Sequence, residues 1–264
     1  MEENLQRIKK DCFLTLLSLH RKANAGHIGS SLSCLDILIY LYFKQMQDDD
    51  RFILSKGHAA AAFYTVLEKA GKIDSTLLES FYRDGTWLAA HPPCNRQIKE
   101  IIFGTGSLGH GLSLAAGIAF ATRFTNKNYK VYTILSDGDC NEGSTWEAAL
   151  FAGQHKLNNL IVIIDKNNLQ GFGKSKDILD LEPLTAKWKS FNFDVCIAEN
   201  GNDFNSLEKS FRSLNYQSQQ PKCIIANTVK GNGVSFMENK IEWHYLPMTA
   251  EQYQQAIGEI ILNA

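Results

Sequence analysis

The chain has 264 residues, and 27 Lys and Arg against 28 Asp and Glu give it a formal net charge of −1. This length is enough for a large buried core, and the balanced charge gives no indication of a nucleic-acid partner. No apolar stretch approaches the roughly 20 residues of a membrane helix, and the first residues lack the apolar core of a signal peptide. The six cysteines form no CxxC pair, so we expect a cytoplasmic protein without membrane contact or disulfides.

The first third of the chain alternates helical and irregular segments. Apolar residues at helical spacing predict a helix over 4–22, and a Gly- and Ser-rich break follows at 24–33. Ser33 is a candidate N-cap for the next helix, which would begin at Cys34. The remaining expectations for this part are a strand at 51–55, a Gly turn and helix at 56–71, and a helix capped by Asp74 that runs to Arg83.

Apolar runs in the rest of the chain predict further strands, each followed by a turn or a helix. We expect strands at 130–136, 159–165, 194–199 and 223–229, with helices at 111–124, 144–157 and 249–262. Strands that alternate with helices and are apolar on both faces are typical of a parallel sheet. The sequence therefore predicts the α/β class, with a parallel sheet covered by helices on both faces and a single domain over residues 1–264.

A glycine-rich string, "GTGSLG", carries Gly104, Gly106 and Gly109 in a GxGxxG spacing. A nicotinamide-binding motif would need a strand before it and an acidic residue about 20 positions later. The preceding "IKEIIF" is a doubtful strand, and position 129 is Tyr129. We therefore disfavour a nicotinamide site and interpret the glycines as a turn that allows close backbone approach.

Two polar residues follow successive predicted strands. Asp137 ends one strand in "SDGD", and Asn167 follows the next in "DKNN", 30 positions later. Adjacent parallel strands would bring the two side chains together at the carboxyl edge of the sheet. Carboxylate and amide oxygens suit Mg²⁺, which completes its shell with phosphate oxygens and water. The simpler alternative is that Asp137 caps the following turn or helix.

Six ordered motifs resemble the transketolase branch of the thiamine-diphosphate enzymes. They run from about Gly26 to His244, and they read "AGHIGSSLS", "SKGHAAAAFY", "HP", "GTGSLGHGLSLAAGIA", "DGDCNEGSTWEAALFAGQHKLNNL" and "TVKGNGVSFMENKIEWH". A complete transketolase is more than twice as long as this chain. The chain resembles only the diphosphate-binding part, and thus the N-terminal subunit of a split transketolase.

The resemblance implies a role for each matching residue. Asp137, Asn167 and the main-chain carbonyl of Leu169 would bind Mg²⁺, and Gly138 would let the diphosphate approach the backbone. The other implied cofactor contacts are His58, His244, Gly106, Ser107 and Leu108. His27 and His91 would contact the donor ketose and move protons, His244 would frame the reaction centre, and Glu142 would lie at the subunit contact.

The sequence context of the histidines supports this assignment. His20 lies on a polar stretch and His155 near a helix end, where a histidine is usually structural or solvated. In contrast, His27, His58, His91 and His244 lie in Gly- or Pro-rich segments of the kind that carry function. A neutral imidazole suits proton exchange with hydroxyl groups. Three departures from the family pattern lie near the pocket: Ser136 in place of a glycine, "LQGFG" after the paired asparagines, and "AAHPP" around His91. A positive φ at Ser136 would be strained.

The resemblance implies a subunit that uses thiamine diphosphate and Mg²⁺ to transfer a two-carbon ketol unit from a ketose to an aldose. The glutamate that activates the cofactor belongs to the part of the family outside this sequence, so we expect a separate C-terminal subunit, an α₂β₂ assembly, and no activity for this chain alone. Alternatives are a 2-oxo acid dehydrogenase α subunit, a deoxyxylulose-phosphate synthase fragment, or a non-catalytic cofactor-binding subunit.

Overall fold

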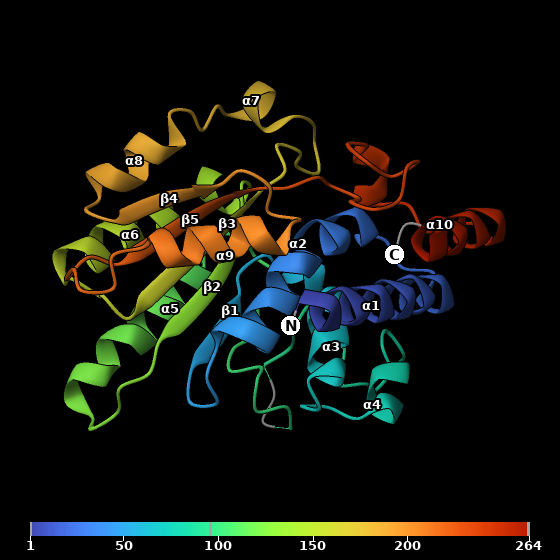
Figure 1. Ribbon diagram of the computed structural model, residues 1–264, viewed down its shortest axis with the longest axis horizontal. Helices are drawn as coiled ribbons and strands as arrows, with labels where there is room; N and C mark the ends of the chain where they lie inside the picture. Colours follow the sequence, from blue (N-terminus) through green and yellow to red (C-terminus); the bar gives the residue numbers. More distant parts are fainter. Residues whose placement is uncertain (1, 95–96, 263–264) are drawn as a thin grey trace.

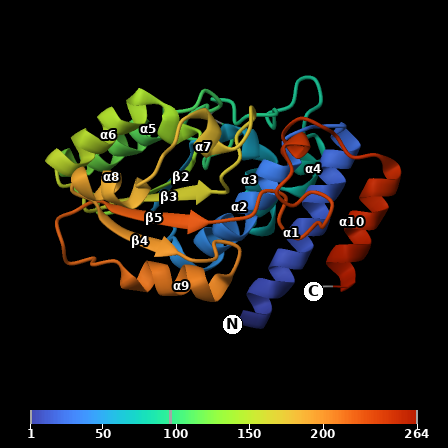
Figure 2. The ribbon, with the colours of Figure 1, turned by 90° about the horizontal axis from the view of Figure 1, so that it is seen from above.

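A computed structural model describes residues 2–94 and 97–262. Five parallel strands form one sheet in the order β1-β2-β3-β5-β4, and the arrows of β3, β4 and β5 point the same way in Figure 2. The strands are β1 Arg51–Leu54, β2 Val131–Ser136, β3 Leu160–Lys166, β4 Asp194–Ala198 and β5 Lys222–Asn227. All the predicted strands are present, and the doubtful segment before Gly104 is not one of them.

Helices cover both faces of this sheet, as the sequence predicted. They are α1 Glu2–Ala23, α2 Ile28–Tyr40, α3 Ala60–Lys69, α4 Ser75–Glu79, α5 Gly111–Ala121, α6 Gly143–Gln154, α7 Ser175–Ile178, α8 Leu184–Ser190, α9 Phe204–Ser213 and α10 Ala250–Leu262. Figure 2 shows α5 and α6 on one side of the sheet and α9 on the other. The last helix packs beside α1, far along the sequence from it (Figure 1).

Alternate side chains of each strand point to opposite faces of the sheet and contribute to two separate hydrophobic cores. In β3, Ile161 and Ile163 contribute to the core shared with α1, α2, α3 and α9, whereas Leu160, Val162 and Ile164 contribute to the core shared with α5, α6 and α8. Successive side chains of a strand point to opposite faces, so a strand covered on both sides must be apolar throughout. No helix in the described ranges is both long and apolar enough to cross a membrane.

Two predicted helix boundaries are wrong. The second helix begins at Ile28, after His27 in a left-handed conformation with φ of 65°, so Ser33 lies inside the helix and does not cap it. Asp74 does cap a helix, with its carboxylate accepting from the Leu77 amide at 2.7 Å, but that helix ends at Glu79 instead of Arg83. The first error comes from a local capping signal, which tertiary contacts of the same side chain can override.

Candidate active site

A pocket of about 270 Å³ lies beyond the carboxyl ends of β2 and β3. The polar loops after β1, β2, β3 and β5 all reach this pocket, as expected for the carboxyl edge of a parallel sheet. Ten of the residues assigned from the sequence line it: His27, His58, His91, Gly106, Leu108, Asp137, Gly138, Asn167, Leu169 and His244.

Two residues assigned from the sequence lie outside the pocket lining. Ser107 is exposed and borders an adjoining hollow with Pro92 and His110. Glu142 is exposed at the start of α6, where its side chain lies against Gly109. A surface position for Glu142 is compatible with the expected contact to another subunit.

Four histidines that are distant in the sequence form one cluster. The ring centroid of His27 lies 5.8 Å from that of His58, 5.7 Å from that of His91 and 5.1 Å from that of His244. The left-handed backbone at His27 lets its amide donate to the carbonyl of His244 at 3.1 Å. The start of α2 and the 3₁₀ turn Ile241–His244 are therefore joined, and their two imidazoles face the same space.

The environment keeps these imidazoles neutral. Burial lowers the pKa of His27 to about 4, with smaller contributions from His91 and Lys230. Burial also lowers the pKa of His58 and of His91. Burial and the nearby charge of Lys230 lower the pKa of His244 to about 3. At neutral pH each ring can therefore donate from one nitrogen and accept at the other.

A buried lysine that the sequence interpretation passed over fixes the state of His244. The ammonium of Lys230 donates to Nδ1 of His244 at 3.0 Å, so the ring proton of His244 lies on Nε2. The Lys230 ammonium also donates to the Leu169 carbonyl at 3.3 Å and to the Ser30 hydroxyl at 3.4 Å. Burial, together with the charge of Lys56, lowers the pKa of Lys230 to about 8. A buried cation with these neutral hydrogen-bond partners suits an anionic ligand.

The proposed metal ligands lie on two successive strand ends. Asp137 is 2% exposed, and its carboxylate accepts from the Ser175 hydroxyl at 2.6 Å. Burial raises the pKa of Asp137 to about 6. The amide oxygen of Asn167 accepts from the Leu169 backbone N–H at 3.0 Å. Within the described ranges, no three His, Cys, Asp or Glu side chains are arranged to hold a metal ion, so a cation here would need amide, main-chain and ligand oxygens.

The second acid of "SDGD" has a different role from the first. Asp139 is fully buried, and its carboxylate accepts from Ser55 Oγ at 2.6 Å, the Gly109 N–H at 2.8 Å and the Ser136 N–H at 2.8 Å. It thus ties together the ends of β1 and β2 and the glycine-rich loop. Ser136 is not among the residues with positive φ. The strain considered for this position is absent, and the Ser136 hydroxyl also donates to Asp139 at 2.9 Å.

The unusual "LQGFG" segment forms one wall of the pocket. A Cβ at Gly171 would lie 2.4 Å from the Tyr245 hydroxyl and 3.3 Å from Nε2 of His244. Only a residue without a side chain leaves this wall unchanged. Phe172 is 88% exposed and borders the mouth of the pocket. Gln170, Gly171 and Phe172 belong to the departure that the sequence analysis placed near the pocket, whereas the position of Tyr245 beside the histidines emerges only in the fold.

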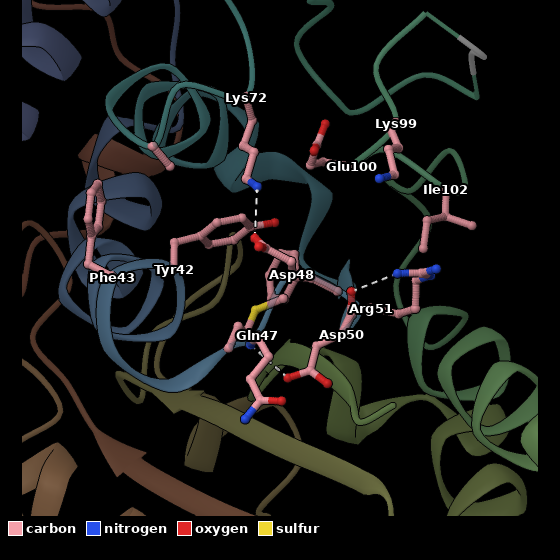
Figure 3. A pocket seen from close by; sticks show the side chains of 13 residues that line it. Tyr42, Phe43, Gln47, Asp48, Asp50, Arg51, Lys72, Lys99, Glu100 and Ile102 are labelled. Atoms are coloured by element: carbon pink, nitrogen blue, oxygen red, sulfur yellow. Dashed lines mark hydrogen bonds and ion pairs between the residues drawn. The ribbon is translucent and has the colours of Figure 1, made fainter. Parts of the chain in front are cut away.

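A larger hollow, of about 670 Å³, lies at the amino end of β1 (Figure 3). Its charged groups are mostly engaged with the chain itself: Asp50 accepts from the backbone N–H groups of Gln47 and Lys130, Lys72 pairs with Asp48, and Arg51 donates to backbone carbonyls. None of the residues assigned from the sequence lines it. The pocket at the carboxyl edge is therefore the better candidate for the active site.

Comparison with known proteins identifies the family. The family model described as transketolase, thiamine diphosphate binding domain, matches residues 7–260. The chain is 39% identical to an apulose-4-phosphate transketolase subunit of Phocaeicola vulgatus, over 93% of this chain and 89% of that protein. It is 37% identical to the 6-deoxy-6-sulfo-D-fructose transketolase subunit SqwG of a Clostridium species, over 90% of each.

A solved structure shows the same architecture. Transketolase from Leishmania mexicana superposes with a TM-score of 0.85 and 26% identity, over 97% of this chain. The match covers 41% of that protein, so this chain spans about two-fifths of its length. The pocket residues, the family match and the shared fold agree, and the chain belongs to the transketolase family, in which it corresponds to the thiamine diphosphate-binding domain.

Proposed function

We propose that this chain is the cofactor-binding subunit of a two-subunit transketolase. The reaction transfers a two-carbon ketol unit from a ketose to an aldose, and a separate C-terminal subunit completes the site, in an α₂β₂ assembly. The observation that carries this proposal is the convergence of four neutral histidines with Asp137 and Asn167 in one pocket. Relatives of nearly the same length that are themselves named as transketolase subunits support the need for a second chain.

The pocket fits magnesium and a diphosphate. Asp137, Asn167 and the Leu169 carbonyl provide hard oxygen ligands for Mg²⁺, and Lys230 provides a positive charge for the phosphate oxygens. Gly138 keeps the backbone accessible, while Gly106 and Leu108 offer a small and an apolar surface to a ring. When bound, thiamine diphosphate would supply the nucleophilic carbon that the protein side chains lack.

The histidines would handle the protons of the sugar. His27 and His91 lie beside each other in the pocket and, as neutral imidazoles, can accept a proton from a ketose hydroxyl or return one. Nε2 of His244 carries the ring proton, so this group would donate to a substrate or cofactor oxygen. His58 lies beside both His27 and His244 and would orient the phosphorylated cofactor.

Glu142 and the cellular setting complete the proposal. The exposed carboxylate of Glu142 at the start of α6 would contact the second subunit. All six cysteines are free, and four of them are buried. Free buried thiols suit a reducing compartment, and we propose a cytoplasmic enzyme.

The test is reconstitution with a C-terminal partner. The chain would be co-expressed with a transketolase C-terminal chain and assayed with Mg²⁺, thiamine diphosphate and a panel of ketose phosphates and sulfo-ketoses as donors. We expect ketol transfer by the complex and none by this chain alone. Transfer by the isolated chain would refute the division of the site between two chains, and no transfer by the complex with any donor would refute the activity.

A matched pair of variants tests whether the subunit is catalytic. His91→Ala in the complex should lower kcat about 10²- to 10⁴-fold, the usual effect of removing a proton-transfer group. The control is His110→Ala, because His110 is exposed and does not line the pocket. Equal turnover of both variants would instead favour a non-catalytic, cofactor-binding role.

A further inference from the structure

The side-chain amide of Asn167 has to present its oxygen to bind a cation, and a buried network beneath it governs that orientation. We propose that Asp165, ion-paired with Lys56 and acting through Ser33, is the positioning residue that fixes the Asn167 amide with Oδ1 toward the metal and diphosphate. This inference rests on the proposed function, since it concerns how the site holds Mg²⁺ and thiamine diphosphate.

The network begins at one oxygen of Asp165. Ser33 Oγ donates to Asp165 Oδ1 at 2.7 Å, and Thr228 Oγ1 donates to the same oxygen. Each hydroxyl has a single hydrogen, and a carboxylate is the strongest acceptor within reach. Both hydrogens are therefore used, and Ser33 can offer only lone pairs to any other group.

Asn167 completes the chain of hydrogen bonds. Its Nδ2 donates to Ser33 Oγ at 3.0 Å, and its Oδ1 accepts from the backbone N–H of Leu169 at 3.0 Å. A reversed amide would place Oδ1 against the lone pairs of Ser33 and the NH₂ group against the N–H of Leu169. Since the site is buried, with Asn167 5% exposed, water could not relieve either repulsion, and each unsatisfied group would be costly.

Lys56 forms an ion pair with the acid at the base of the network. Its ammonium pairs with Asp165 Oδ2, and both side chains are fully buried. Burial by itself would lower the pKa of Lys56, but the Asp165 carboxylate outweighs this effect and raises the pKa above its ordinary value. Lys56 also donates to the Ser30 carbonyl at 3.1 Å. The ion pair thus joins the loop after β1 to β3 and α2, under the floor of the pocket.

Two hydroxyl deletions separate the effect of the Asn167 amide orientation from the general effect of losing a hydrogen bond to Asp165. Ser33 and Thr228 both donate to Asp165 Oδ1, but only Ser33 contacts Asn167. The complex of this chain with its C-terminal partner would be titrated with thiamine diphosphate and Mg²⁺, and binding would be followed by ³¹P line broadening. We expect Ser33→Ala to weaken Mg²⁺-dependent binding about tenfold, as for one well-placed hydrogen bond, and Thr228→Val to change it less than about twofold.

A measurement without metal gives the second readout. Thiamine diphosphate binding in EDTA should be the same for Ser33→Ala and the wild type, because the amide would act only through the cation. Equal weakening by both variants, or equal loss with and without Mg²⁺, would overturn the inference, as would unchanged binding by Ser33→Ala. If the alanine variant does not fold, Ser33→Cys keeps the volume with a weaker acceptor, and the same outcomes apply. Absence of Mg²⁺-dependent binding by the wild-type complex would instead overturn the proposed function.

Discussion

The ammonium of Lys230 lies 3.0 Å from Nδ1 of His244, and the two residues are 14 positions apart in the sequence. This contact places a buried positive charge beside the histidine cluster and sets the tautomer of one of its members. It also explains why a pocket that holds Asp137 can still accept an anion. The hydrogen-bond partners of the lysine are an imidazole, a carbonyl and a hydroxyl, all of them neutral. Its positive charge therefore remains available to neutralise an anionic ligand.

Replacement of Lys230 by methionine should weaken cofactor binding and raise the pKa of His244. A lost charge-assisted hydrogen bond corresponds to about 1.5–3 kcal/mol, or about 10- to 100-fold in affinity for thiamine diphosphate with Mg²⁺. Without the lysine charge, burial would remain as the main cause that lowers the pKa of His244, so the value should rise, and NMR titration of the ring would measure it. Lys240→Met, at an exposed position, is the control. Equal affinities would contradict the role assigned to Lys230.

The two acids of "SDGD" should respond to substitution in opposite ways. Asp139→Ala leaves buried donors of Ser55, Gly109 and Ser136 without their acceptor, so the free energy of unfolding should fall by about 3 kcal/mol or more. Asp137→Ala should cost less, about 1–2 kcal/mol, because it removes the acceptor of the Ser175 hydroxyl and the Gly138 N–H, while burial already disfavours the ionised form of Asp137. The same substitution should nevertheless abolish the Mg²⁺-dependent binding of thiamine diphosphate. Urea unfolding and a Mg²⁺ titration of both variants would check this, and the reverse pattern would show that Asp139 is the functional acid.

Two glycines of α5 offer a matched test of packing. A Cβ at Gly117 would meet nothing within 4 Å, so Gly117→Ala should raise the free energy of unfolding by about 0.5–1 kcal/mol. A Cβ at Gly111 would lie 2.3 Å from Cβ of Ser55, so Gly111→Ala should lower it by about 1–3 kcal/mol. Chemical denaturation measures both, and equal effects would mean that α5 does not pack against the end of β1 as described.

Stability should decrease as the pH falls below about 6.5, the ordinary histidine pKa. The pKa values of His20 and His27 are lowered to about 4 in the folded chain, chiefly by burial. The unfolded chain therefore binds more protons between these values, and the free energy of unfolding rises with pH across that window. Asp137, whose pKa is raised to about 6, has the opposite effect below pH 6, but it is outnumbered by the buried histidines, which include His58 and His244.

His20 provides the variant for this measurement, because its ring is buried away from the pocket. His20→Asn should reduce the slope of the free energy of unfolding by up to about 1.4 kcal/mol per pH unit between about pH 6 and 4.5. A His20→Asn slope equal to that of the wild type would show that His20 is not held neutral by the fold.

The strands and ten of the residues that line the pocket could be predicted from the sequence. Val131–Ser136 and Leu160–Lys166 are continuous apolar runs that end in polar turns, and a buried parallel strand needs little more than that. The start of α2 could not be predicted in this way. Ser33 has the composition of an N-cap, but its hydroxyl bonds Asp165, 132 positions away, inside the helix.

The sequence by itself therefore determined the α/β class, the order of the strands and helices, and the histidines and strand-end polar residues of the pocket, because each depends on local pattern or on motifs. Only the tertiary structure decided that Asp139 ties the loops together, that Lys230 and Tyr245 belong to the pocket, and which groups are held neutral. Those properties depend on burial and on contacts between segments far apart in the chain, and no local stretch of sequence specifies either.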